Sequence, residues 1–75
     1  MDLSYKQFQK IFLPDIHINL SGEQGYELYQ IVLSSKTIST DLLSKVISDD
    51  TLSFYGLSRK RAEWFRMKTY EYIYK

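Results

Sequence analysis

The sequence predicts a mostly α-helical protein, a small bundle of four or five short helices with a possible short extended segment or edge strand at residues 15–20. Two observations support this fold class. Apolar residues recur three and four positions apart in several windows of the chain, which places them on one face of a helix. Most of these windows follow a serine, threonine or aspartate, the residues that best cap a helix N-terminus.

The composition is that of a single small domain, residues 1–75. The chain contains no cysteine, so disulfides and thiolate metal sites are excluded and stability must come from packing. Apolar residues make up 44% of the chain, and seven tyrosines, four phenylalanines and one tryptophan supply ample material for a core. No long apolar run and no signal-like N-terminus is present, so we expect a soluble, cytoplasmic protein.

Residues 4–12 predict a first amphipathic helix, capped by Ser4 or Asp2. Pro14 should end it, because proline disfavours a helical conformation in the preceding residue and donates no backbone hydrogen bond. The predicted apolar face consists of Tyr5, Phe8, Ile11 and Phe12.

Residues 15–20 alternate between polar and apolar side chains, as an extended segment with one buried face does. Residues 36–39 and 51–55 are the candidate pairing partners. His17, the only histidine, lies beside Asp15, but no further histidine or carboxylate has matching spacing, so we predict a surface histidine and no metal site.

Two more helices are predicted from caps and periodicity. Ser21 and Gln24 form a capping box before a helix that runs to about Ser34, and Ser39 or Thr40 caps the next. No lysine and Ser/Thr pair follows the glycines of the first of these helices, so we predict no nucleotide or other cofactor. The predicted buried residues are Tyr26, Tyr29 and Leu33, broadened by Leu28, Ile31 and Val32, in the first helix, and Leu42, Leu43, Val46 and Ile47 in the second.

The window from residue 48 to residue 68 resembles the helix-turn-helix motif of DNA-binding regulators. A short helix is followed by the turn Gly56-Leu57-Ser58 and then by a strongly basic helix. The resemblance implies that Leu57 is the buried residue of the turn and that Ser58 caps a recognition helix. It also implies that Ala62 and Phe65 face the core.

The same resemblance implies which residues meet DNA. Residues at the start of a recognition helix reach base edges or phosphates, and the remaining cations neutralise the DNA backbone. One such helix buries little surface, so a homodimer is expected. The implied contact residues are Ser58, Arg59, Lys60, Arg61, Glu63, Trp64, Arg66, Met67 and Lys68.

Charge is polarised along the chain, which favours an anionic partner, either duplex DNA or an acidic protein surface. Residues 1–57 contain four lysines and seven acidic residues, whereas residues 58–75 contain six basic and two acidic residues. A solvated helix face balanced by acidic neighbours would give the same pattern.

The tyrosine-rich end of the chain suggests an alternative function. A helix with aromatic residues on more than one side has more apolar surface than a small core covers. We therefore also consider a protein-binding modulator, such as a small inhibitor or antirepressor, with Trp64, Tyr70 and Tyr74 as its interface. These aromatic residues could instead simply pack the helix onto the core. Without paired carboxylates or a histidine beside a nucleophile, we do not expect an enzyme.

Overall fold

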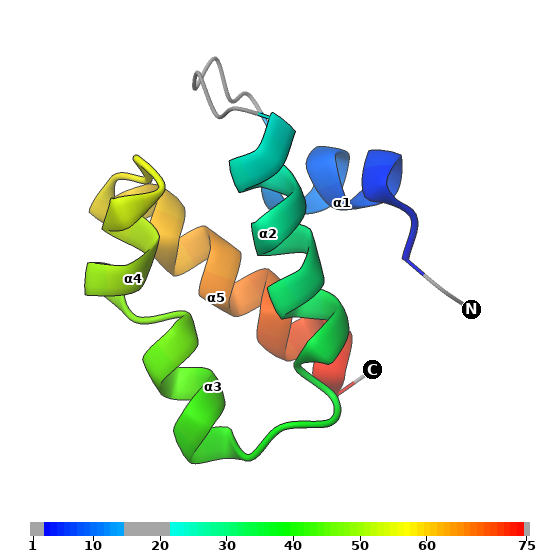
Figure 1. Cartoon of the computed structure of the whole chain (residues 1–75), viewed down its shortest axis with the longest axis vertical. Coiled ribbons are helices and arrows are strands. Elements are labelled where there is room, and N and C mark those ends of the chain that lie inside the picture. Colours follow the sequence, from blue (N-terminus) through cyan, green and yellow to red (C-terminus); the bar gives the residue numbers. More distant parts are fainter. Residues whose placement is uncertain (1–2, 15–21, 75) are drawn as a thin grey trace.

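The computed structural model describes residues 3–14 and 22–74, and this part of the chain forms five α-helices with no strand (Figure 1). This confirms the predicted helical fold class. Residues 51–54 are helical, so they do not form a strand. Residues 15–20, and with them His17, Asp15 and the Ser21 cap, lie outside the described residues. The helices are α1 (Tyr5–Phe12), α2 (Gly22–Ser34), α3 (Thr40–Val46), α4 (Asp49–Phe54) and α5 (Arg59–Ile73).

Four of the helices begin at a serine whose hydroxyl caps the first turn. In each case the Oγ atom accepts a hydrogen bond from the backbone N–H three residues later, at 3.1–3.3 Å. Ser4 and Gln7 also form a reciprocal capping box. Ser4, Ser39 and Ser58 are among the caps predicted from the sequence, and Ser48 caps α4 in the same way.

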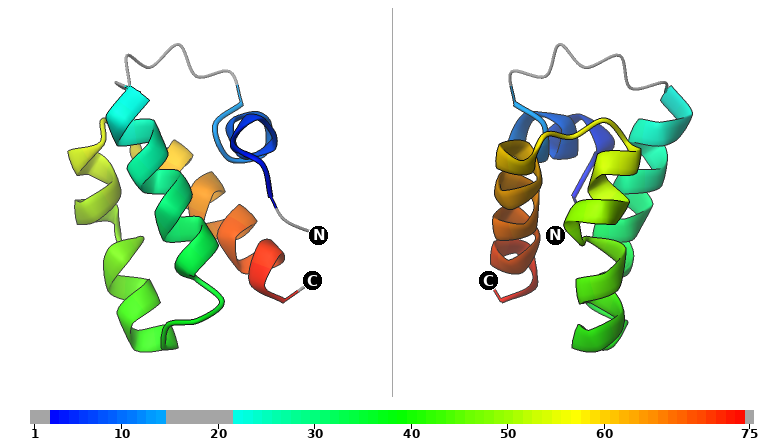
Figure 2. Two further views of the ribbon diagram at one scale, coloured as in Figure 1. Left: turned by 45° about the vertical axis from the view of Figure 1, so that its right-hand side comes forward. Right: turned by 90° about the vertical axis from the view of Figure 1, so that its left-hand side faces the viewer.

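The helices form two sides with α1 across one end (Figure 2). In the right-hand view, α5 forms one side, while α2 and the end-to-end pair α3 and α4 form the other. The radius of gyration is 11.3 Å, close to the ~11 Å expected of a compact chain of this length.

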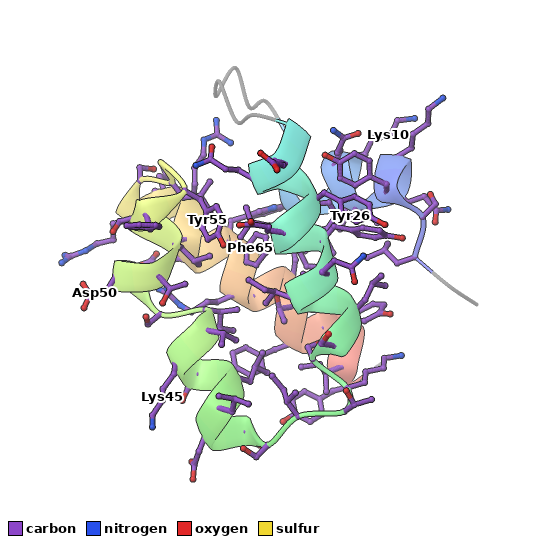
Figure 3. All side chains as sticks on the ribbon, in the orientation of Figure 1. Lys10, Tyr26, Lys45, Asp50, Tyr55 and Phe65 are labelled. Carbon is purple, nitrogen blue, oxygen red and sulfur yellow. The ribbon has the colours of Figure 1, made fainter. Side chains whose placement is uncertain are left out.

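Aromatic rings join α1 to both sides of the molecule. Phe65 points from α5 into the interior (Figure 3), where its ring centroid lies 6.1 Å from that of Phe8 and 5.4 Å from that of Phe12. Phe8 in turn lies 5.3 Å from Tyr29 of α2. The buried apolar core consists of Leu3, Phe8, Phe12, Leu28, Val32, Leu43, Ile47, Leu52, Leu57, Ala62 and Phe65.

Three predicted core residues are exposed, and each lies at the edge of its helix's apolar face. Ile11, Tyr26 and Leu42 are each exposed by 43% or more. In α1, the pair Phe8 and Phe12 points at the neighbouring helices, which turns Ile11 outward. Periodicity thus located the apolar faces of α1 and α3 but included one exposed residue in each. In α2 it centred the face on Tyr26, Tyr29 and Leu33, whereas Leu28 and Val32 are the fully buried side chains.

Gly25 allows α1 to pack closely against α2. A Cβ atom at this position would lie 2.7 Å from the Tyr5 hydroxyl oxygen, and the next nearest atom, Tyr5 Cζ, would be at 3.9 Å. An alanine here would require the Tyr5 side chain to shift, and this cost offsets part of the roughly 1 kcal/mol by which alanine exceeds glycine in helix propensity.

We expect Gly25→Ala to stabilise the Tyr5→Phe variant by up to about 1 kcal/mol and the wild-type chain by less, because only the wild type has the clashing oxygen. Urea denaturation of the wild type, both single variants and the double variant gives the difference. An equal effect of Gly25→Ala in both backgrounds would show that Tyr5 moves aside freely.

Tyr55, at the C-terminal end of α4, connects this helix to α2 (Figure 3). Its hydroxyl donates a hydrogen bond to Glu27 Oε2 at 3.0 Å. Burial raises the pKa of Tyr55 above its ordinary value, and the hydrogen bond to the Glu27 carboxylate and its negative charge raise it further.

Because the pKa of Tyr55 is raised, the stability that its hydroxyl group contributes to the fold depends on pH. The folded chain holds the phenolic proton more tightly than the unfolded chain, so the contribution is present below about pH 10 and is lost as the pH rises through the folded-state pKa. We expect the wild type to be more stable than Tyr55→Phe at pH 8, and the gap to narrow above pH 10. Urea denaturation midpoints from about pH 8 to 11 measure this difference in stability. Glu27→Gln serves as the control that removes only the negative charge beside the hydroxyl group. A constant gap would contradict this assignment.

Candidate nucleic-acid interface

The turn between α4 and α5 has the local geometry that the helix-turn-helix resemblance implies. Gly56 has a φ of 82°, a backbone conformation that favours glycine. Leu57 is buried, and its N–H donates to the Leu52 carbonyl at 3.2 Å. Ser58 then caps α5. The chain therefore reverses direction between Tyr55 and Ser58, with a buried leucine anchoring the turn.

The two helices on either side of this turn pack on a common apolar seam. Leu52 of α4 is buried, as are Ala62 and Phe65 of α5, so the predictions for Ala62 and Phe65 are confirmed. α4 has only six residues, which makes it a short first helix for the motif. The seam fixes which side of α5 faces solvent.

The solvent face of α5 begins with two exposed cations. Arg59 and Lys60 are exposed and form no ion pair or hydrogen bond with the described residues. The first turn of α5 contains basic residues and no acidic residue, although it is the positive end of the helix dipole. Further along the same face lie three more exposed residues predicted to contact DNA, Glu63, Trp64 and Met67.

The other three predicted cations have partners inside the molecule. Arg66 Nη1 lies 2.7 Å from Asp49 Oδ1 and donates to the Ile47 carbonyl at 3.3 Å, which fastens α5 to the start of α4. Arg61 Nη1 donates to the Pro14 carbonyl at 2.7 Å. These two side chains stabilise the fold, and Arg59 and Lys60 are the better candidates for an external anion.

Lys68 and Trp64 interact with one another on the outer face of α5. The Lys68 ammonium lies 4.6 Å from the Trp64 ring centroid and 3.6 Å from Glu71 Oε1. Trp64 Nε1 donates to the Ile11 carbonyl at 3.0 Å, so its indole ties α5 to the end of α1. The sequence offered no signal for this contact, because its two residues are 53 positions apart.

Some of the tyrosines at the end of α5 pack against the core, and one is exposed to solvent. Tyr70 and Tyr72 are half-buried against the core, whereas Tyr74 is 73% exposed. The rings of Tyr70 and Tyr74 are nearly parallel, with centroids 6.3 Å apart. Together with Met67 and Glu71 they line a shallow depression on the outer face of α5.

This chain matches no known protein family, no curated protein and no solved structure. Among residues 3–14 and 22–74, no helix is long and apolar enough to cross a membrane. The same ranges hold no group of three or more histidine, cysteine, aspartate or glutamate residues that could bind a metal ion. The candidate interface therefore rests on its own geometry and charge.

Proposed function

We propose that this chain is a small regulatory DNA-binding protein of the helix-turn-helix type, which places the start of α5 against duplex DNA. The observation that carries the proposal is the order of features along residues 56–60. A positive-φ glycine, a buried leucine and a capping serine are followed directly by exposed Arg59 and Lys60. This order places two cations that have no partner among the described residues at the start of a helix.

The residues at this tip have complementary roles in the proposed complex. Arg59 and Lys60 can donate to phosphate oxygens or to the acceptor atoms of guanine in the major groove. A phosphate beside the first turn of α5 is favoured by the helix dipole. The Arg66–Asp49 ion pair links the start of α4 to α5, so the two helices would approach the duplex together.

The proposal predicts binding to duplex DNA that weakens as salt increases, because each neutralised phosphate releases bound counterions. Fluorescence anisotropy with a labelled duplex of mixed sequence, at about 50 to 200 mM salt, measures this dependence. Two phosphate contacts give a slope of log K against log salt of about −2 for each copy bound. Binding that is absent, or independent of salt, would contradict the proposal.

The C-terminal half of α5 supports a second candidate function, docking onto a protein as a modulator. Met67 is 46% and Tyr74 is 73% exposed, and both line the same apolar depression. Trp64 and Tyr70 are less suitable for testing this function by mutation, because Trp64 bonds to α1 and Tyr70 packs on the core. Met67→Ala and Tyr74→Ala should therefore remove a protein partner without unfolding the chain.

A further inference from the structure

The outer face of α5 contains an apolar stripe with one charge of each sign. Trp64, Met67 and Tyr74 are all exposed and recur at helical spacing, so they lie along one side of the helix. Lys68 and Glu71 lie on the same stretch, with 23% and 57% of their side chains exposed. This stripe begins one turn after Arg59 and Lys60.

We infer that a second copy of the chain binds to this stripe, with the two α5 helices antiparallel about a two-fold axis at the level of residues 69–70. In this arrangement, Lys68 of each copy comes opposite Glu71 of the other, because the two residues lie at equal distances on either side of the axis. A symmetric interface requires this kind of self-complementary surface. The stripe provides such a self-complementary surface, because it contains one cation, Lys68, and one anion, Glu71.

The apolar residues are self-complementary about the same axis. Tyr74, the most exposed residue of the stripe, comes level with residue 65 of the other copy, between its Trp64 and Met67. The shallow depression lined by Met67, Tyr70, Glu71 and Tyr74 faces residues 65–72 of the other copy. Each copy therefore contributes both projecting rings and the surface that they cover.

The paired segment is short, and it leaves the start of α5 uncovered. At 1.5 Å rise per residue, residues 64–74 overlap over about 15 Å. Ser58, Arg59 and Lys60 lie outside this overlap, so these three residues stay exposed in the pair. An interface of this size is small, and we expect a weak dimer that forms at high protein concentration.

Sedimentation equilibrium over about 20 μM to 1 mM tests this inference, because weak dimers dissociate in this range. We expect the wild-type mass to rise from 9.0 kDa toward twice that value. Lys68→Glu and Glu71→Lys should each remain monomeric, because each places like charges opposite one another. Mixed in equal amounts, the two variants should pair, since one then offers two anions and the other two cations.

The controls separate pairing from folding. Circular dichroism melts should show that both single variants are folded, because the Lys68–Glu71 pair within one chain is partly exposed and such pairs contribute little to stability. Met67→Lys, at another exposed position, should also be monomeric, and the double variant Lys68→Glu/Glu71→Lys should dimerise as the wild type does. A monomeric wild type at every concentration, even one that binds a different protein through this face, would overturn the inference. So would single variants that pair as tightly as the wild type, or a mixture that stays monomeric.

Discussion

Replacing Phe65 with alanine should remove a large share of the chain's free energy of unfolding at 25 °C. The Phe65 side chain is fully buried, and its ring contacts both Phe8 and Phe12, so it joins α5 to α1. Truncation of a buried phenylalanine costs about 3–5 kcal/mol, whereas a chain of this length has a free energy of unfolding of roughly 4–11 kcal/mol. Urea denaturation followed by circular dichroism at 222 nm should show a large loss of stability.

Phe54 provides the matched control for this prediction. It is 85% exposed at the end of α4, so Phe54→Ala removes the same atoms without leaving a cavity. We expect this change to alter the free energy of unfolding by no more than about 0.5 kcal/mol. If the two variants lost equal stability, the core would not be centred on the aromatic cluster of α1 and α5.

Sequence reasoning predicted the helices well because their determinants are local. Each capping serine acts on a backbone N–H three residues away, so Ser39 and Ser58 can be identified without knowledge of the fold. Gly56 is likewise identified by its place between a short helix and a basic one, and its φ of 82° confirms the turn. Local steric and hydrogen-bonding rules are sufficient for such features.

The roles of the basic residues could not be predicted in the same way, because they depend on distant partners. Arg61 bonds to a carbonyl 47 residues away and Arg66 to a carboxylate 17 residues away, and both were predicted to contact DNA. A sequence pattern gives the number and positions of the cations. The packing of the helices determines which of these cations form ion pairs or hydrogen bonds within the fold. The structure therefore narrows the candidate cations to Arg59 and Lys60.

Replacing both Arg59 and Lys60 with alanine should weaken binding to duplex DNA by roughly 30-fold or more at constant salt, if the proposed function is correct. Each lost contact to a base is worth about 1–3 kcal/mol, and each lost phosphate contact lowers the salt slope by about one. The same anisotropy titration with the labelled duplex measures both quantities. The fold should be stabilised slightly, because the change removes two positive charges from the positive end of α5.

This opposite effect on folding makes the result decisive, since lost binding could not then be attributed to unfolding. The matched control is Lys10→Ala/Lys45→Ala, which removes the same charge from exposed positions on α1 and α3 (Figure 3). A general electrostatic attraction would be weakened equally by both pairs of changes, whereas contacts at the start of α5 would be lost only with Arg59 and Lys60. Equal losses would therefore argue against α5 as a recognition helix and in favour of non-specific attraction.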